Sequence, residues 1–363
     1  MARLLVTGGA GFIGANFVRY WQGTRPGDDI TVLDALTYAG RRDNLPDGQS
    51  VRFVHGSIND GTLVERLMRD FDIDTIVHFA AESHVDRSIS DPDAFIATNV
   101  MGTQTMLRVA KQVWLDGSGK PHRFHHISTD EVYGTLGRDE PAFTEEAQYA
   151  PNSPYAASKA ASDHLVRAFH RTYGLQVTTS NCSNNFGPYQ HPEKLIPLFL
   201  SNALSGLPLP IYGDGMNVRD WLFVGDHCEG IGCILDDGEI GETYNIGGGT
   251  EVPNLVVIEA ICDFVDRSFA EDRAMALHFP DAPAASGQPT AILKRFVTDR
   301  PGHDRRYAIN AAKIEGALGF RPGHDFETAL ALTCRWYIDN PAWWGHLAEK
   351  LHRVRQRVRQ RVG

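Results

Sequence analysis

Cysteine is scarce in this chain of 363 residues, and the five cysteines that it has are scattered. None forms a Cys-x-x-Cys pair, so a zinc site or a redox motif of that type is not predicted. An odd number of scattered cysteines is typical of reduced thiols in a cytoplasmic protein. We therefore expect no disulfide framework, no metal site and a cytoplasmic location.

Long apolar runs are also missing, and positive charge is outnumbered. No run approaches the roughly 20 residues of a membrane span. The chain goes directly into a short apolar strand, Arg3–Thr7, so we expect no signal peptide. Lys and Arg number 35 against 45 Asp and Glu, which gives a formal net charge of −10. This surplus disfavours non-specific binding to nucleic acid, so we expect neither nucleic acid nor membrane as a partner.

Strands and helices alternate along the first half of the chain. Apolar runs predict strands at 3–7, 30–33, 51–54, 75–80, 123–127 and 176–180. Helical patterns lie between them, the longest at 95–114 and 156–173. Alternation of this kind predicts an α/β fold with a parallel, doubly wound sheet.

A glycine-rich turn follows the first predicted strand. Gly8, Gly11 and Gly14 give the pattern G-x-x-G-x-x-G, and a helix to about Trp21 comes next. Such spacing lets the backbone turn tightly and bring its N–H groups close to a pyrophosphate. A glycine pattern alone is weak evidence, and a tight turn without ligand is the alternative. The position between strand and helix favours a dinucleotide site.

The second predicted strand ends at Asp34, twenty residues after Gly14. An acid at this place can accept hydrogen bonds from the adenosine ribose, and it repels a 2′-phosphate. NAD is therefore predicted rather than NADP. The predicted organisation is an NAD-binding Rossmann-type domain at 1–180, to which later segments return. A smaller α/β substrate-binding domain at 181–345 and a basic tail at 346–363 follow.

Two adjacent carboxylates lie where the strand at 123–127 ends. Thr129, Asp130 and Glu131 belong to the stretch Ser-Thr-Asp-Glu-Val-Tyr-Gly that begins at Ser128. In open parallel sheets the ligand lies at the carboxyl ends of the strands. Burying charge there is costly unless the charge is used or paired. A solvated acidic turn is the alternative, and the surrounding motifs favour a site.

Tyr155 and Lys159 are four residues apart on the helix that begins at Pro154, so they share one helix face. A lysine ammonium near a phenol favours the phenolate and lowers its pKa. The pair therefore predicts a general base at neutral pH. A surface Tyr and Lys on an amphipathic helix is the alternative, but the neighbouring alanines indicate close packing.

Positive charge is concentrated locally in the second half of the chain. The segment 181–194 is rich in Asn, Gly and Pro, which is typical of a binding loop. Arg219 and the arginines of 299–306 match phosphate oxygens in geometry. In a negatively charged chain they indicate a diphosphate site, with ion pairing to Asp220 and Asp304 as the alternative.

Together these motifs resemble the extended short-chain dehydrogenase/reductase superfamily and, more closely, the dTDP-glucose 4,6-dehydratases. The matching segments are 36–40, 80–89, 128–134, 155–159, 184–197, 217–221 and 300–307. The resemblance covers nearly the whole chain to about residue 340. Its most specific element is Thr129-Asp130-Glu131, because related epimerases have the Tyr and Lys but lack this acidic pair.

The resemblance implies an NAD-dependent lyase that converts dTDP-glucose to dTDP-4-keto-6-deoxyglucose and water. C4 is oxidised, water is eliminated across C5 and C6, and the hydride returns to C6. Thr129 would hydrogen-bond the sugar 4-hydroxyl, Asp130 would be the general acid and Glu131 the general base. Tyr155 would be the oxidation base, with Lys159 as its partner. Relatives also pair the helices at 95–114 and 156–173 into a four-helix bundle, so a homodimer is expected.

The same resemblance and motifs give the binding residues. Those expected to contact NAD are Gly8, Gly11, Phe12, Ile13, Gly14, Asp34, Ala35, Thr37, Ser57, Ile58, Ala80, Ala81, Ser83, Asn99, Tyr155, Lys159 and Asn185. Those expected to contact the nucleotide sugar are His84, Thr129, Asn184, Lys194, Leu195, Pro210, Tyr212, Arg219, Asn254, Arg300 and His303. Ser57 stands where the family usually has an Asp near adenine, so NAD is expected to leave more easily than in relatives.

Two other classes of function stay open at this point. One is a different sugar-nucleotide 4,6-dehydratase or an epimerase, acting for example on GDP-mannose or CDP-glucose. The other is a non-catalytic NAD-binding protein. Intact Tyr155, Lys159 and Glu131 disfavour the second class.

Overall fold

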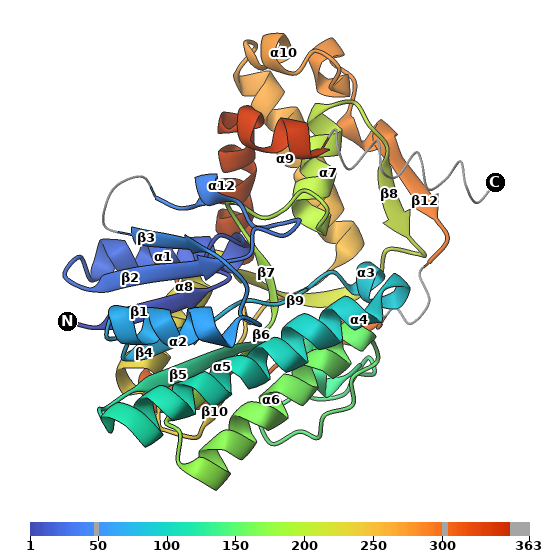
Figure 1. The fold of residues 1–363 in the computed structure, drawn as a ribbon. Coiled ribbons are helices and arrows are strands. Elements are labelled where there is room, and N and C mark those ends of the chain that lie inside the picture. Colours follow the sequence, from blue (N-terminus) through green and yellow to red (C-terminus); the bar gives the residue numbers. More distant parts are fainter. Residues whose placement is uncertain (47–50, 300–303, 349–363) are drawn as a thin grey trace.

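The computed structural model describes residues 1–46, 51–299 and 304–348, and a seven-stranded sheet lies at its centre (Figure 1). Neighbouring strands pair parallel throughout, in the order β10-β6-β5-β4-β1-β2-β3. The strands are β1 (Arg3–Thr7), β2 (Asp29–Asp34), β3 (Val51–His55), β4 (Thr75–His78), β5 (Arg123–Thr129), β6 (Val177–Cys182) and β10 (Thr243–Ile246). The predicted doubly wound α/β fold is confirmed.

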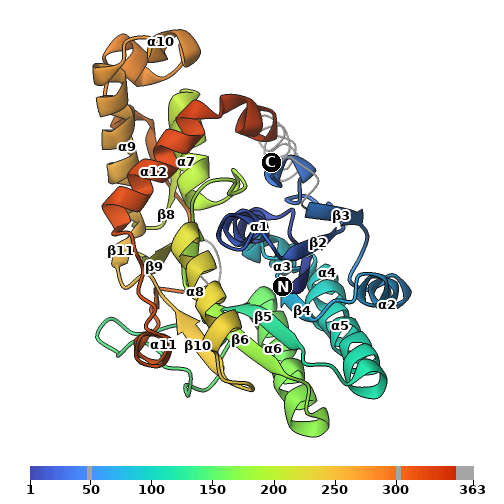
Figure 2. The ribbon, with the colours of Figure 1, turned by 90° about the vertical axis from the view of Figure 1, so that its left-hand side faces the viewer.

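Helices cover both faces of this sheet, as Figure 2 shows. One face packs against α1 (Phe12–Thr24), α8 (Val224–Asp237) and α11 (Ala312–Leu318). The other packs against α2 (Gly61–Asp70), α5 (Thr103–Ala110) and α6 (Pro154–Tyr173). Successive side chains of β1 alternate between the faces: Leu4 and Val6 join the first core, and Leu5 joins the second.

The helix predicted at 95–114 is longer in the structure and runs from 92 to 118. It consists of α4 (Pro92–Phe95), a π-helical segment Ile96–Gly102, α5, and a second π-helical segment Lys111–Ser118. The short helix α3 (Val85–Ser90) precedes it. Helices α5 and α6 lie side by side along the lower edge of Figure 1.

The rest of the chain forms a smaller lobe above the carboxyl edge of the sheet (Figure 1). Strands β7 (Asn184–Phe186), β9 (Val218–Phe223), β11 (Glu251–Pro253) and β13 (Arg306–Tyr307) form one small sheet, and β8 (Leu209–Tyr212) pairs with β12 (Lys294–Val297). The helices of this lobe are α7 (Leu195–Leu204), α9 (Asn254–Glu271), α10 (Met275–His278) and α12 (Phe326–Asp339).

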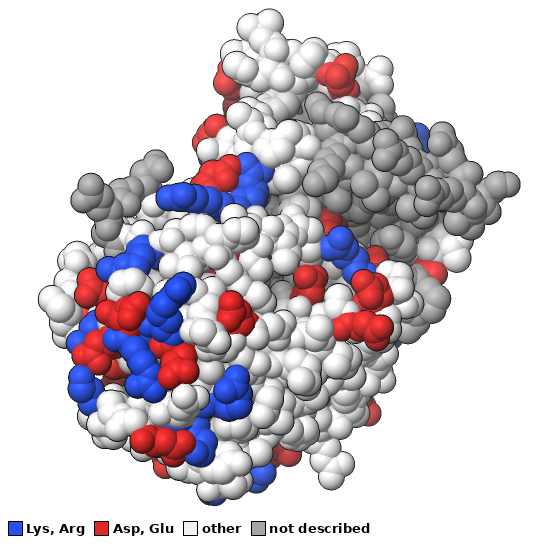
Figure 3. All heavy atoms as spheres, in the orientation of Figure 1, with Lys and Arg blue, Asp and Glu red and all other residues white. Residues whose placement is uncertain are grey.

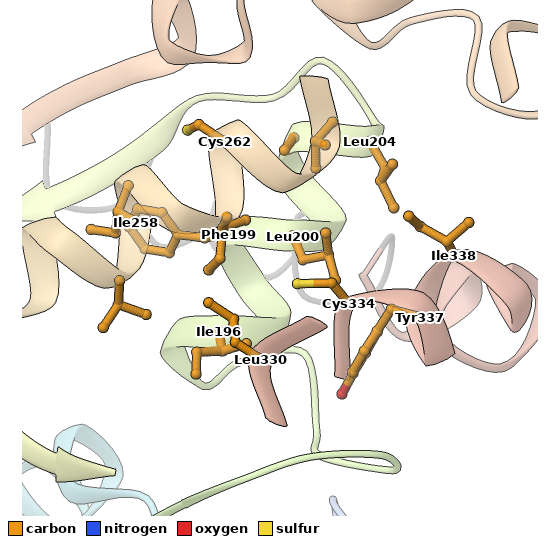
Figure 4. Packing of buried hydrophobic residues seen from close by; sticks show 14 of the residues in the cluster. Ile196, Phe199, Leu200, Leu204, Ile258, Cys262, Leu330, Cys334, Tyr337 and Ile338 are labelled. Carbon is orange, nitrogen blue, oxygen red and sulfur yellow. The ribbon is translucent and has the colours of Figure 1, made fainter. Parts of the chain in front are cut away.

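The core of the smaller lobe is separate from the cores of the large sheet. Phe199 of α7, Ile258 of α9 and Tyr337 of α12 are among the side chains that meet there (Figure 4). Three segments of this half of the chain nevertheless belong to the large sheet, because β10 extends it at one edge and α8 and α11 pack against one of its faces. The lobes also meet where Trp343 donates an indole hydrogen bond of 2.9 Å to the side chain of Asn44.

Strand β5 extends two residues beyond its predicted end at Ile127. Ser128 pairs with Asn181 and Thr129 with Cys182 of β6, so the ladder continues to Thr129. A 3-10 turn, Asp130–Tyr133, starts immediately afterwards. The acidic pair is therefore held by a rigid strand end rather than by a loose loop.

The helices of the described ranges are each too short or too polar to span a membrane. The predicted basic tail at 346–363 lies outside the described residues from 349 onward.

Candidate active site

A cavity of about 370 Å³ opens at the carboxyl edge of the large sheet. Residues at or just beyond the ends of five strands line it: Gly8, Asp34, Phe79, Thr129 and Cys182. The loop at 182–194 closes its other side. Ligands of open α/β sheets bind at this edge, so the cavity is the candidate active site.

The three glycines of the turn after β1 are needed for different structural reasons. A Cβ at Gly8 would lie 2.6 Å from the backbone nitrogen of Ala80, and one at Gly14 would lie 2.4 Å from the carbonyl oxygen of Gly8. Gly8 also has a positive φ of 69°. Gly11 faces the cavity, with only Gly8 O within 4 Å of its Cβ position. Two glycines thus allow close packing, and the third leaves room for a ligand at the start of α1.

The start of α1 suits a diphosphate. Gly11 is the N-cap residue and provides no side-chain hydrogen bond to the first turn. The first amides of a helix have no partner inside the helix, and the helix dipole favours an anion there. Phe12 and Ile13, the first two helical residues, line the cavity. The glycine turn therefore fits a dinucleotide pyrophosphate.

Asp34 lies at the end of β2 with both carboxylate oxygens engaged by backbone. The amide of Ala10 donates to Oδ2 at 2.9 Å and that of Leu36 donates to Oδ1 at 2.8 Å. Each oxygen keeps a second lone pair, which can accept from a ribose hydroxyl. Burial raises the pKa of Asp34. The carboxylate is thus oriented toward the cavity, and its place fits an adenosine ribose.

All but one of the predicted cofactor residues line the cavity. Those found there are Gly8, Gly11, Phe12, Ile13, Gly14, Asp34, Ala35, Thr37, Ser57, Ile58, Ala80, Ala81, Ser83, Tyr155, Lys159 and Asn185. Asn99 does not line it. Its amide instead accepts from the Glu82 backbone at 2.8 Å and donates to Ser158 at 2.9 Å, so it fixes the cavity wall from behind.

The acidic pair lies at the centre of the cavity lining. Asp130 is only 2% exposed, and burial raises the pKa of its carboxyl well above the usual value. Nearby Glu131 and Asp220 raise this pKa further, whereas Arg219 and Thr129 oppose the shift. Oδ2 of Asp130 is buried without a hydrogen-bond partner in the described structure. Burial therefore favours the protonated form of Asp130, which is the form that a general acid requires.

Glu131 is half-buried and is held at its backbone by the side chain of Thr129. The charge of Glu131 raises the pKa values of Asp130, Tyr155 and Tyr307, which places the carboxylate among all three. Adjacent carboxyl groups in unequal surroundings take different protonation states. Asp130 is fully enclosed and Glu131 is not, so the two carboxyl groups lie in unequal surroundings.

Tyr155 and Lys159 are both buried on α6 and line the cavity. Lys159 Nζ donates to the carbonyl oxygen of Ile127 at 2.7 Å. Burial raises the pKa of Tyr155 well above its ordinary value, Glu131 adds to the shift, and Thr129 opposes it. Burial thus favours the neutral phenol, and the prediction that the pair supplies a general base at neutral pH stays a prediction.

The predicted substrate residues fall into three groups. Thr129, Asn184 and Lys194 line the cavity, and Lys194 Nζ donates to the Ser83 carbonyl at 3.0 Å. Residues of the smaller lobe lie outside this cavity: Leu195 at the start of α7, Pro210 and Tyr212 on β8, Arg219 on β9, and Asn254 at the start of α9. Arg300 and His303 lie outside the described residues.

Two details of the smaller lobe nevertheless point to a ligand. The side-chain oxygens of Asn184 and Asn254 are buried without a hydrogen-bond partner among the described residues. Buried polar atoms are normally satisfied, so each indicates a missing donor. Arg219 is 5% exposed, donates to the carbonyl oxygens of Val218 and Asp304, and lies over the Tyr307 ring.

His84, also predicted to contact the substrate, does not line the cavity but lies beside Glu193, which does. Its Nε2 is 3.5 Å from Glu193, and the ring of His191 is 3.7 Å from the same carboxylate. Burial lowers the pKa of both histidines to about 4, so both are neutral at pH 7. His191 also meets the ring of Tyr38, which lines the cavity.

Tyr307 of β13 is a residue that the sequence reasoning missed. Its pKa is raised by burial and then by Glu131, so the phenol lies close to the proposed base. Tyr307 belongs to the segment 300–307 that carries part of the family resemblance, but nothing in the local sequence pattern gave it a role in binding or catalysis. Only pairing of β13 with β9, which are distant in sequence, brings it to the site.

Within the described ranges, no cluster of three or more His, Cys, Asp or Glu side chains has the arrangement of a metal site. The structure does bring together a carboxylic acid, a carboxylate, a phenol and an ammonium group. They lie beside the glycine turn, which fits a dinucleotide.

Comparisons with known proteins agree with this arrangement. Residues 5–333 match the family model described as GDP-mannose 4,6 dehydratase. A dTDP-glucose 4,6-dehydratase from Xanthomonas campestris pv. campestris (strain B100) is 53% identical over 349 residues, covering 94% of this chain and 95% of that relative.

Solved structures lead to the same family. DesIV, a dTDP-glucose 4,6-dehydratase from Streptomyces venezuelae solved with NAD bound, is 48% identical with a TM-score of 0.84, covering 95% of this chain and 99% of that chain. A UDP-glucose 4-epimerase from Thermus thermophilus in complex with NAD is 30% identical with a TM-score of 0.78, covering 92% of this chain and 98% of that chain. The chain belongs to the dTDP-glucose 4,6-dehydratases, as its sequence motifs predicted.

Proposed function

We propose that this protein converts dTDP-glucose to dTDP-4-keto-6-deoxyglucose and water, with NAD as its cofactor. The observation that supports this most is the enclosed acidic pair, Asp130 and Glu131, which line one cavity with Tyr155. An enzyme that only oxidises and re-reduces C4 needs the phenol alone. Elimination of water also needs a separate acid and base, and the pair supplies both.

The first step is removal of the proton from the sugar 4-hydroxyl by Tyr155. Thr129 lies beside this phenol and can hold the same hydroxyl. The residues of the glycine turn and Asp34 would hold NAD⁺, which would supply positive charge and the reversible hydride transfer that oxidation at C4 and reduction at C6 need. Lys159, anchored to the strand by Ile127, adds a second positive charge that stabilises the phenolate.

The second step is elimination across C5 and C6. The new C4 ketone acidifies the C5 proton, which Glu131 removes. Asp130, which burial keeps protonated, donates to the departing 6-hydroxyl. The two carboxyl groups thus act as base and acid in one step, and the protonation state of each follows from its surroundings.

The direct test is incubation of the purified protein with dTDP-glucose, followed by detection of the ultraviolet-absorbing 4-keto product in alkali. Product analysis also separates the proposal from a different sugar-nucleotide dehydratase or an epimerase. An epimerase gives a C4 epimer and no deoxy sugar. Parallel incubations with GDP-mannose, CDP-glucose and UDP-glucose complete the comparison, and preference for any of them would contradict the proposed substrate.

Selectivity for NAD over NADP is expected from Asp34. Its two oxygens are fixed by the amides of Ala10 and Leu36, so the carboxylate cannot easily turn away from a ribose 2′-phosphate. Repulsion between a fixed carboxylate and a phosphate should weaken NADP binding by at least about tenfold, the equivalent of one pKa unit of interaction. Titration calorimetry of cofactor-stripped protein with each dinucleotide measures this ratio. Equal affinity would show that Asp34 does not face the 2′-position.

The faster loss of NAD expected from Ser57 stays a prediction. Ser57 lines the cavity, and its hydroxyl accepts from the Asn59 backbone at 3.1 Å. A serine supplies less acceptor charge than the Asp usual in the family.

We further propose that two copies of the chain form a homodimer through α5 and α6. The helical stretch at 92–118 exposes Ile96 and Met101, which are 49% and 55% exposed. The outward face of α6 carries the small residues Ala157 and Ala168 together with Arg167 and Arg171. Figure 3 shows few charged side chains over the central part of these helices. Exposed apolar side chains beside small residues suit close packing against another helix pair.

Light scattering should therefore give about twice the 40.1 kDa of one chain at micromolar concentration. Met101→Arg places a charge in the proposed interface and should shift the mass toward one chain. Leu277→Arg is the matched control, because Leu277 is 82% exposed on α10 in the other lobe. A monomer at all concentrations, or equal effects of both variants, would contradict the proposed interface.

A cytoplasmic location is part of the same proposal. All five cysteines are free thiols, and four of them are buried. The proposed division into a cofactor domain and a substrate domain is likewise supported by the core of the smaller lobe, which is separate from the cores on the two faces of the large sheet. Elements β10, α8 and α11 return to the large sheet.

A further inference from the structure

Asp163 is a buried carboxylate on α6, one helical turn after Lys159. Its side chain is 5% exposed, and it is not among the residues that line the active-site cavity. Burial of a carboxylate is costly unless it is hydrogen-bonded and paired with a positive charge. Asp163 therefore needs an explanation that the proposed steps do not supply.

Three donors converge on the carboxylate of Asp163. The hydroxyls of Ser128 and Tyr149 donate to Oδ2 at 2.8 and 3.1 Å, and Nε2 of His126 lies 3.1 Å from Oδ1. An ionised carboxylate only accepts, so this set of partners fits the charged form. In the Nε2–H tautomer, His126 also donates, and its Nδ1, which has no partner among the described residues, is left without a proton.

The positive charge that balances this anion belongs to Lys159. His126 is fully buried, and burial lowers its pKa well below the usual value, so His126 is neutral. Lys159 lies four residues before Asp163 on the same helix, and its Nζ donates to Ile127 O. Ile127 stands between His126 and Ser128 on β5, whose side chains bind Asp163. One strand segment thus holds both members of the pair.

The titratable groups around Asp163 come from three elements. Lys159 and His164 lie on α6, His126 lies on β5, and Tyr149 and Tyr133 lie between β5 and α6. Burial raises the pKa of Asp163 to about 6, with Lys159 and the hydroxyl donors opposing the shift. Asp163 is therefore charged at pH 7 to 8. Burial lowers the pKa of Lys159, and Asp163 is the first group that opposes this.

We propose that Asp163 is a positioning residue whose fixed negative charge keeps Lys159 protonated beside Tyr155 during oxidation at C4. This inference rests on the proposed function, in which Lys159 stabilises the phenolate. Asp163 acts only through Lys159 and touches no reacting atom. Its charge therefore sets the pH above which the oxidation step fails.

Asp163→Asn tests this, because it keeps the shape and removes the charge. A unit charge about 6 Å away, at an effective dielectric constant of about 20, shifts a pKa by about two units. Lys159 should then lose its proton at lower pH, and the alkaline limb of the kcat/KM profile should move down by about one to two units. The two profiles should converge at low pH, and above the limb of the variant the parent should be faster by up to about tenfold for each unit by which the limb moves.

Ser128→Ala and Tyr149→Phe are the matched controls. Each removes one hydrogen bond to Asp163 and leaves the charge in place. Each should lower thermal stability without moving the alkaline limb. If Asp163→Asn lowers activity by the same factor at every pH, Asp163 is merely structural and the proposal fails.

A stability cycle tests the pair independently of turnover. Asp163→Asn and Lys159→Met each leave one buried charge unpaired, whereas the double variant leaves none. Urea unfolding of the four proteins should show that the double variant loses less than the sum of the single losses. If the double variant folds and neither single variant does, that result also supports the pairing. Additive losses would contradict the pairing.

If the parent makes no 4-keto product, the proposed function fails, but this cycle still decides whether Asp163 and Lys159 are coupled.

Discussion

The Glu131→Gln enzyme should oxidise its substrate at C4 and then stop. Gln keeps the shape of the side chain but cannot remove the C5 proton, and loss of a general base typically slows a reaction by about 10²- to 10⁴-fold. Tyr155 and Thr129 are unchanged, so the first step should survive. Without elimination there is no acceptor at C6, so reduced nicotinamide should accumulate. Absorbance of the reduced cofactor should rise on mixing with dTDP-glucose, without formation of 6-deoxy product.

Tyr155→Phe is the matched control for that experiment, because it blocks the preceding step. It should bind substrate and show neither the absorbance rise nor product. Turnover of Glu131→Gln at the parent rate would mean that Glu131 is not the base. Loss of both the absorbance rise and the product, with substrate still bound, would place Glu131 in the oxidation step instead.

Six of the seven strands of the large sheet were predictable because they are short apolar runs that alternate with helices of regular period. Strand β10 was missed, because it comes from the second half of the chain and joins the sheet only through its pairing with β6. The glycine turn and Asp34 were predictable for a related reason: in this fold the cofactor contacts follow the ends of consecutive strands. The end of β5 was misplaced by two residues, since Ser128 and Thr129 are polar and look like the start of a loop. Pairing with Asn181 and Cys182 of β6 keeps them in the sheet.

Charge states at the site could not be predicted from sequence. The spacing of Tyr155 and Lys159 gives their common helix face, but the depth of burial decides the pKa of the phenol. The sequence likewise contains both members of the Asp130–Glu131 pair without saying which is enclosed. Burial is the main cause of the raised pKa of Asp130, and the charge of Asp220 on β9, some ninety residues away in the chain, adds to it.

Groups brought in by distant segments were also missed. Tyr307 reaches Glu131 through the pairing of β13 with β9, and Asp163 gains its partners from β5. In the sequence Asp163 looks like an ordinary polar position of an amphipathic helix. Only the packing of α6 against the sheet makes it a buried anion, and that packing is a property of the whole fold.

Asp130→Asn should lower activity by about 10²- to 10⁴-fold and at the same time stabilise the protein at neutral pH. The activity falls because Asn cannot give a proton to the departing 6-hydroxyl. The stability gain follows from the raised pKa of Asp130, which reflects the cost of burying a carboxyl group beside Glu131 and Asp220. Asn avoids that cost, and conflict between stability and activity is common at such sites.

Unfolded Asp releases its proton near pH 3.9, whereas folded Asp130 keeps it to a much higher pH. Folding therefore takes up a proton over that interval, and stability of the parent falls as pH rises through it. Asn does not titrate, so the stability difference between variant and parent should be small near pH 4 and grow toward neutral pH. Urea unfolding from pH 4 to 8 measures it. A variant that is less stable than the parent at pH 7 would show that Asp130 is ionised and paired in the folded protein, and that it cannot be the acid.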